Sequence, residues 1–169
     1  MFSLTNPQLP LILASSSPRR SALIRQIGLP FDTVDTVVDE TLRPYESPVD
    51  HVQRLAAEKA ENAASSEPHH WVIAADTIVL VEGKVLGKPR DTRDARRMLL
   101  TISGREHQVL TAFCIRNVAL DVRSLLVVKT DVLIKELSSQ EIDAYIASGE
   151  PMDKAGAYGV QGIGSFMIR

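Results

Sequence analysis

Apolar and polar positions along the chain follow two patterns, one typical of β-strands and the other of α-helices. Continuous or alternating apolar runs predict strands at residues 11–14, 31–38, 71–81, 107–116 and 122–135. A Glu82–Gly83 turn predicts a hairpin with a short return strand. Apolar residues three and four apart predict a helix that begins at Pro18 and two more at residues 49–64 and 92–102.

The last third of the chain carries two further signals. Ser138 and Glu141 have the spacing of a capping box, which predicts a helix that ends at Gly149. The glycine-rich residues 149–164 predict a tight loop, and the final residues predict a strand. Strands that alternate with helices and hairpins indicate an α/β fold with a mixed sheet.

The turn at residues 15–18 holds an unusual pair of charges. Ser17 is a typical N-cap and Pro18 a typical first helical residue, so Arg19 and Arg20 fall in the first turn, where the helix dipole favours anions. They are either solvated surface residues or part of a phosphate site. The serines beside them favour a phosphate site. The spacing of Arg20 from Leu23, Ile24 and Ile27 predicts that it points inward along an apolar stripe.

Two charged residues interrupt apolar patterns. Lys59 shares a helix face with the apolar residues Val52, Leu55, Ala56, Ala60 and Ala63, so it either extends to solvent or meets an anion. Asp76 interrupts the strand 71–81, where an unpaired charge would cost several kcal/mol. Asp76 should therefore have a cationic partner, in a structural ion pair or a functional site, or bind a metal.

Other polar residues occupy strand ends and the glycine-rich loop: Glu40, Lys88, Asp153, Lys154 and Gln161. Two carboxylates with several cations suit Mg²⁺-assisted phosphoryl chemistry, because the metal needs oxygen ligands and phosphates need donors. The histidines indicate less. His69 and His70 are expected in solvent, and His107 is expected to be structural. The sequence has no G-x-S-x-G elbow, Walker motif or Rossmann fingerprint.

Composition limits the partners and the compartment. The chain has 169 residues with 44% hydrophobic content, enough to fill one α/β domain or two small lobes that share a core, and we expect a single domain over residues 1–169. A net charge of −2 gives no general attraction to nucleic acid or to anionic membranes. We expect no signal peptide and no membrane span. The single cysteine, Cys114, is expected in the core and suits the cytoplasm.

Seven ordered motifs then resemble a known family. These are "SSSPRR", "ESP", "LAAEKA", "AADT", "LGKP", "SGREHQVLT" and "GEPMDKAGAYGVQG", and the resemblance covers Leu11 to Ile168. Their order and spacing resemble the Maf family of nucleotide pyrophosphatases, and most closely the branch that hydrolyses dTTP and UTP. The resemblance implies a twisted mixed α/β sheet flanked by helices, as in inosine triphosphatases, with an active-site cleft between two lobes.

The resemblance also implies roles for residues. Nucleoside triphosphates would be cleaved to the monophosphate and pyrophosphate with Mg²⁺ or Mn²⁺, in house-cleaning of the nucleotide pool. Asp76 would be the proton acceptor, and Asp76 and Glu40 would hold the metal. Lys88 would take part in catalysis together with Asp76 and Glu40. Base selectivity is associated with Arg20, Thr77 and Gln161. Further substrate contacts are expected from Ser15, Arg19, Lys59 and Lys154. A homodimer is the implied assembly.

Two alternatives stay open at this point. The first is hydrolysis of 7-methyl-GTP, although that branch resembles this sequence less, because it has an acidic residue at position 161 and replaces Thr77. The second is a nucleotide-binding regulator of septum formation that does not hydrolyse its ligand. Family members usually continue beyond Ile168 with a further helix, so the C-terminus is expected to be truncated relative to the family.

Overall fold

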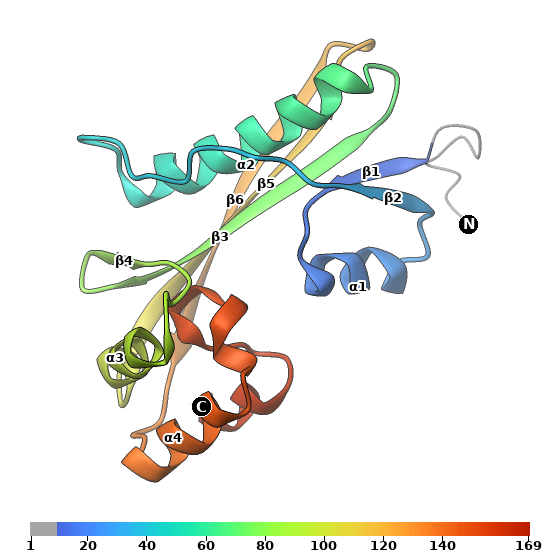
Figure 1. Ribbon diagram of the computed structural model, residues 1–169. Helices are drawn as coiled ribbons and strands as arrows, with labels where there is room; N and C mark the ends of the chain where they lie inside the picture. The colour runs from blue at the N-terminus through green and yellow to red at the C-terminus, as the bar shows by residue number, and fades with distance from the viewer. Residues whose placement is uncertain (1–9) are drawn as a thin grey trace. The chain divides into compact units, whose positions relative to one another are not determined.

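The computed structural model describes residues 10–169 (Figure 1). The chain divides into two compact units. Unit 1 includes residues up to Asp76 together with Thr111–Val127, and unit 2 consists of Thr77–Leu110 and Val128–Arg169. The boundary falls inside three strands: β3 (Val72–Val81), β5 (Glu106–Asn117) and β6 (Val122–Leu133). Each of these strands therefore contributes residues to both units.

Six strands form one sheet in the order β2-β1-β3-β5-β6, with β4 (Lys84–Leu86) paired to β3. The sheet is mixed, because β1 (Leu11–Ala14) is parallel to β2 (Phe31–Val34) and to β3, while β4 is antiparallel to β3. Glu82 and Gly83 both have positive φ angles, as the tight turn of a β-hairpin requires. The predicted mixed α/β class and the predicted hairpin are confirmed.

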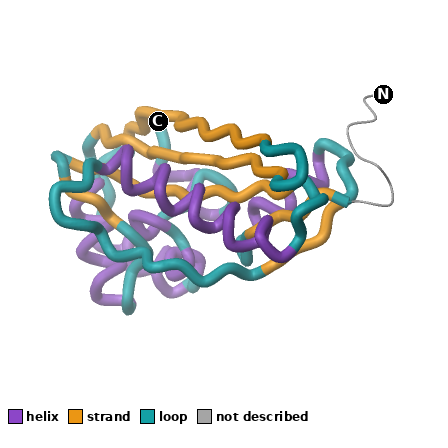
Figure 2. Tube along the Cα trace, turned by 90° about the horizontal axis from the view of Figure 1, so that it is seen from above, coloured by secondary structure: helices purple, strands orange, loops and turns teal. Residues whose placement is uncertain are grey.

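In unit 1, α1 (Pro18–Gln26) connects the parallel strands β1 and β2, and the long helix α2 (Pro48–Ser66) follows a loop. All five apolar residues that the spacing placed on one face of α2 are buried, as predicted: Val52, Leu55, Ala56, Ala60 and Ala63. Figure 2 shows the loop between β2 and α2 running in teal alongside α2. Cys114 is buried, as expected.

In unit 2, α3 (Thr92–Ile102) has the predicted bounds, and α4 (Ser139–Ala147) begins with the predicted capping box between Ser138 and Glu141. Three 3₁₀ helices follow, η1 (Glu150–Asp153), η2 (Ala155–Ala157) and η3 (Ile163–Met167). The core of unit 2 combines side chains from α3, α4, the strands and this C-terminal segment, among them Leu99, Ile102, Ile142 and Met167.

The strand predicted at residues 31–38 is too long. β2 ends at Val34 because its partner β1 ends at Ala14, which is paired with Val34, and the chain beyond has no strand to bind. Val37 is instead 93% exposed, and its carbonyl accepts a hydrogen bond from the Asn62 side chain.

The apolar stripe predicted on α1 is also wrong, since Leu23 and Ile27 are 48% and 64% exposed. The buried residue of this nine-residue helix is Ser21, whose small side chain allows close packing. Spacing alone therefore selected the wrong face of a helix with few apolar residues.

The strand predicted at the C-terminus is replaced by η3, and only Ile168 forms an isolated bridge, with Ile134. The amides of Ile163 and Gly164 donate to the Glu150 carboxylate, at 2.9 and 3.0 Å, instead of to a neighbouring strand. Gly164 is buried, and a Cβ atom added to it would lie 2.5 Å from the Gly159 carbonyl oxygen, so this close approach of the backbone requires glycine.

Candidate functional site

A lysine and two carboxylates form the centre of the candidate site, and all three belong to unit 1. The Lys59 ammonium on α2 donates to Asp76 Oδ1 on β3 and to Glu40 Oε1 on the loop before α2, each at 2.7 Å. The side chains of Lys59 and Asp76 are only 12% and 13% exposed, whereas that of Glu40 is 61% exposed. The anion predicted for Lys59 is therefore a carboxylate pair, and Asp76 has the predicted cationic partner.

The electrostatics of Lys59 show how strong this cluster is. Burial alone would lower the pKa of Lys59, but the charges and hydrogen bonds of Asp76 and Glu40 outweigh it, so the pKa is raised. Lys59 is thus held in its charged form. A lysine that contacts both carboxylates offsets the repulsion between them.

The turn at residues 15–18 and the arginines that follow it, Arg19 and Arg20, lie in the same unit. The structure confirms Ser17 as the N-cap position and Pro18 as the first residue of α1. Arg20 is half-buried and donates to the buried Ser15 hydroxyl at 3.2 Å. Burial lowers the pKa of Arg20, and the charge of Asp76 opposes this shift. Arg20 therefore belongs to the electrostatic neighbourhood of Asp76, although the predicted stripe beside it is wrong.

Arg19 is half-buried and contributes to the same field, since its charge is one of those that lower the pKa of Arg20. Six of the predicted site residues therefore lie in unit 1: Ser15, Arg19, Arg20, Glu40, Lys59 and Asp76. Within it, hydrogen bonds join Lys59 with Asp76 and Glu40, and Ser15 with Arg20.

The donor set fits a magnesium-type cation. Among residues 10–169 no group of three or more His, Cys, Asp or Glu side chains forms a complete metal cage. Mg²⁺ usually binds through one or two carboxylates and completes its shell with water and substrate phosphates. Glu40 and Asp76 both contact the Lys59 ammonium group. The two carboxylates are as many as such a site needs from the protein.

The four remaining predicted residues belong to unit 2. Thr77 follows Asp76 on β3 and is half-buried, and strand alternation directs the two side chains to opposite faces. Lys88 is exposed after β4. Lys154 is buried, and its ammonium donates to the Glu150 carbonyl at 2.6 Å and to Asp153 at 2.7 Å. Gln161 is exposed on a loop between Gly159 and Gly162.

Sequence reasoning missed the side chains that hold these residues in place. Glu150 accepts from the amides of Ile163 and Gly164, and Tyr145 donates to Glu150 at 3.0 Å and accepts from Gly159 at 3.3 Å. These two residues clamp the loop that carries Gln161. The glycines on either side of Gln161 were the available signal, because such a loop needs outside partners to hold one conformation.

His107 is structural, as expected. It is 3% exposed, and its Nε2 lies 2.6 Å from the Tyr158 hydroxyl, also in unit 2. Burial lowers the pKa of His107 and raises the pKa of Tyr158 to about 12. Both groups are therefore held neutral.

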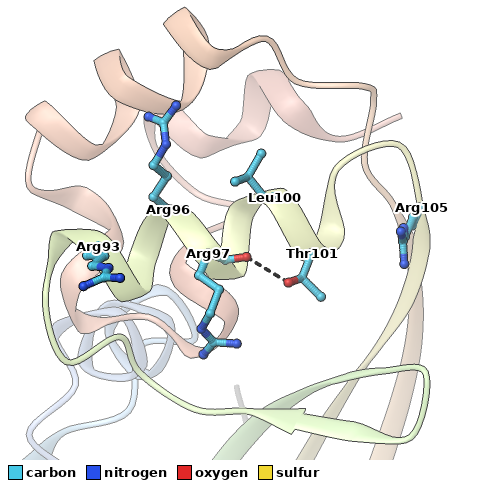
Figure 3. A pocket seen from close by; sticks show the side chains of 6 residues that line it. All are labelled: Arg93, Arg96, Arg97, Leu100, Thr101 and Arg105. Atoms are coloured by element: carbon cyan, nitrogen blue, oxygen red, sulfur yellow. Dashed lines mark hydrogen bonds between the residues drawn. The ribbon is translucent and has the colours of Figure 1, made fainter.

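Unit 2 has a hollow of about 470 Å³ along α3 and the turn before β5 (Figure 3). It is lined by Arg93, Arg96, Arg97, Leu100, Thr101 and Arg105, none of which was predicted as a site residue. Figure 3 shows Arg96 and Arg97 pointing in opposite directions from the helix. Carboxylates neutralise three of the arginines: Asp143 pairs with Arg96, Asp94 with Arg97 and Glu82 with Arg105. These arginines do not converge on one anion.

No helix within residues 10–169 combines the length and the apolar character that a membrane crossing requires.

The fold is similar to that of the Ham1 protein of Staphylococcus aureus. The two chains are 16% identical, with a TM-score of 0.51, over 73% of this chain and 71% of that one. This likeness shows a shared fold.

Curated relatives match nearly the whole chain. A protein of Desulfotalea psychrophila is 47% identical over 95% of this chain and 82% of its own length. Relatives from Syntrophus aciditrophicus and Bacillus cereus are 48% and 46% identical, over 94% of this chain and 78% and 77% of their own lengths. All three are named dTTP/UTP pyrophosphatase.

The model of the Maf-like proteins matches residues 10–169, which include every residue of the candidate site. The ordered motifs, the fold and the relatives agree with this match, and the chain belongs to the Maf family.

Proposed function

We propose that this chain hydrolyses dTTP and UTP to the monophosphate and pyrophosphate. The observation that carries the proposal is the cluster of Lys59, Asp76 and Glu40 beside Arg20 and Ser15, in a chain that is 46–48% identical to proteins named dTTP/UTP pyrophosphatase. The cluster supplies carboxylates for a cation and a proton, and cations for phosphates.

Each residue of the site has a separate role in the proposed reaction. Asp76 accepts a proton from the attacking water, and the hydrogen bond from Lys59 orients its carboxylate. Asp76 and Glu40 hold Mg²⁺ or Mn²⁺, which when bound neutralises phosphate charge and orients the nucleophile. Ser15, Arg19 and Arg20 donate to the triphosphate, and burial strengthens each of these interactions. Lys88 and Lys154 are further phosphate contacts.

Base selectivity is assigned to Gln161, with Arg20 and Thr77. A glutamine amide offers one donor and one acceptor, which complements the carbonyl and N3–H of uracil and thymine. A carboxylate at this position would only accept, which suits guanine. The proposed substrates therefore follow from the amide at position 161.

The test is pyrophosphate release from dTTP, UTP, CTP, GTP and 7-methyl-GTP, with Mg²⁺, with Mn²⁺ and with chelator. Selective, metal-dependent cleavage of dTTP and UTP is expected. Asp76→Asn should lose at least about a thousandfold in kcat and still bind nucleotide. A folded wild-type protein that cleaves none of the panel would overturn the proposal and favour a binding regulator. Preference for 7-methyl-GTP would overturn the assignment of the base.

The remaining features of the proposal concern the whole protein. It acts in the cytoplasm on free nucleotides, as one domain of two lobes, with no nucleic-acid or membrane partner, and it assembles as a homodimer. The net charge of −2 and the single buried cysteine support the compartment and the choice of a small ligand. Light scattering on the purified protein tests the dimer.

A further inference from the structure

The loop that carries Glu40, residues 35–47 between β2 and α2, is fastened along α2 (Figures 1 and 2). Asn62 donates to the Val37 carbonyl at 3.2 Å, and Arg43 donates to Glu58 at 2.9 Å. Lys59 contacts Glu40 itself. The loop and the helix both belong to unit 1, so the position of Glu40 depends on contacts within this unit.

Arg54 of α2 makes the largest number of these contacts. Its Nη1 donates to the carbonyl of Asp39 and its Nη2 to the carbonyl of Thr41, both at 3.0 Å, and these residues directly flank Glu40. The guanidinium also binds both oxygens of Glu46, at 2.6 and 3.1 Å, and Glu58 at 3.2 Å. The side chains of Arg54 and Glu46 are only 11% and 8% exposed.

The Glu40 side chain is 61% exposed, so packing around it does little to fix its position. Lys59 binds its carboxylate, and Arg54 holds the backbone on either side of it. A planar guanidinium is suited to hold two carbonyls at a fixed separation, whereas an ammonium group can act only as a point charge.

We propose that Arg54 is a positioning residue for Glu40, and that it sets the affinity of the site for the divalent cation. This inference rests on the proposed function, in which Glu40 is a metal ligand. Mg²⁺ and Mn²⁺ bind well only when their ligands are held in the correct geometry, and residues that orient ligands change metal affinity.

The proposal and simple electrostatics predict opposite results for Arg54→Gln. Removal of a positive charge near a cation site should strengthen cation binding, whereas release of the loop should weaken it. Arg116 provides a matched control in unit 1. It is 14% exposed, donates to two backbone carbonyls, those of Asn117 and Val122, and pairs with Glu61, but it does not contact the loop 35–47.

The experiment is titration of the full chain with Mn²⁺ alone, followed by electron paramagnetic resonance, with circular dichroism as a check of folding. We expect Arg54→Gln to weaken Mn²⁺ binding at least about tenfold, and Arg116→Gln to leave it within about twofold of wild type. An Arg54→Gln protein that binds Mn²⁺ as tightly as wild type would overturn the proposal. Arg54→Lys keeps the positive charge and removes the planar guanidinium, and it provides the test if Arg54→Gln does not fold. Weaker Mn²⁺ binding in Arg54→Lys supports the positioning role of Arg54. Unchanged Mn²⁺ binding overturns it.

Glu40→Gln separates this inference from the proposed function. Weaker Mn²⁺ binding in Glu40→Gln is expected, and adding Arg54→Gln to that variant should cause no further loss. Independent, multiplying losses would show that Arg54 does not act through Glu40. If Glu40→Gln binds Mn²⁺ normally, the assignment of Glu40 as a metal ligand is wrong, and this role for Arg54 is overturned with it.

Discussion

Lys59 and Asp76 each make the burial of the other tolerable. Their charged atoms lie 2.7 Å apart, and both side chains are almost withdrawn from water. Loss of Lys59 leaves the Asp76 carboxylate without the cation that it binds directly, in a poorly solvated place, whereas loss of both groups removes both charges.

Lys59→Met should therefore lower the free energy of unfolding by about 3 kcal/mol, and much of this loss should be recovered in Lys59→Met/Asp76→Asn. Urea unfolding at pH 7 measures both values. The exposed pair of Arg43 and Glu58 is the control, since Arg43→Ala should change stability by less than about 1 kcal/mol. Equal losses in the single and the double variant would contradict this account.

His107 should make the free energy of unfolding depend on pH. Burial lowers its pKa in the folded protein below the ordinary value of 6.5, so the unfolded chain binds a proton more readily. Its contribution is fully present above pH 6.5 and is lost as the pH falls through the folded pKa.

His107→Gln should flatten the fall in unfolding free energy below about pH 6.5. Urea denaturation at half-unit steps of pH would measure the slope. His69→Gln is the control, because His69 is exposed in a loop and should leave the slope in place. A slope that survives in His107→Gln must come from other groups.

At the scale of elements, two Ser-Pro helix starts look alike in the sequence and differ in the structure. Ser47 precedes Pro48, and its hydroxyl accepts the Asp50 amide at 3.1 Å. Ser17 precedes Pro18, but its side chain makes no capping hydrogen bond.

Ser47→Ala should cost about 1 kcal/mol of stability, and Ser17→Ala much less, because only the first removes a capping bond. Thermal and urea unfolding of the two variants measure the difference. A loss in Ser17→Ala as large as that in Ser47→Ala would show that the N-cap bond is not the cause.

The clamp on residues 159–164 predicts an effect on the backbone. Glu150→Gln replaces one acceptor oxygen by an amino group that faces backbone donors, so the amides of Ile163 and Gly164 should lose protection. Hydrogen exchange followed by NMR measures this. Glu141→Gln is the control, since Glu141 binds Lys135 and caps α4. Unchanged protection at both amides would contradict the clamp.

The sequence predicted helices and strands correctly where local signals determine them. It predicted them wrongly where their ends depend on another segment of the chain. The amphipathic face of α2 and the capping box of α4 are local patterns, and both are confirmed. The end of β2 depends on where β1 stops, which the residues of β2 do not reveal. The contacts of Arg54 with two carbonyls depend likewise on the path of a loop.

At the scale of the whole molecule, ligand binding should appear as added stability. In Asp76→Asn, which is expected to bind without turnover, dTTP at a hundred times its dissociation constant should stabilise the fold by about 2.7 kcal/mol. Differential scanning fluorimetry measures the shift in melting temperature. Gln161→Ala in the same background should reduce the shift for dTTP but not for inorganic triphosphate. Equal shifts for dTTP in both proteins would remove Gln161 from base recognition.

The sequence predicted the pairing of the buried charges better than it predicted the side chains that hold the loops. Asp76 and Lys59 stood out because each charge interrupts an apolar pattern, and the structure joins them directly. Glu46 and Glu150 gave no such signal, since a carboxylate beside a loop proline or glycine looks like any solvated residue until its partners are known.

The two compact units are each assembled from separated stretches of sequence, and the boundary between them cuts β3, β5 and β6 internally. No single cleavage of the chain, and no choice of one start and one stop codon, yields either unit whole. Neither half can therefore be produced as a contiguous fragment or transferred by a simple gene fusion. Exchange of either unit between relatives would have to transfer at least two separate segments of the chain together.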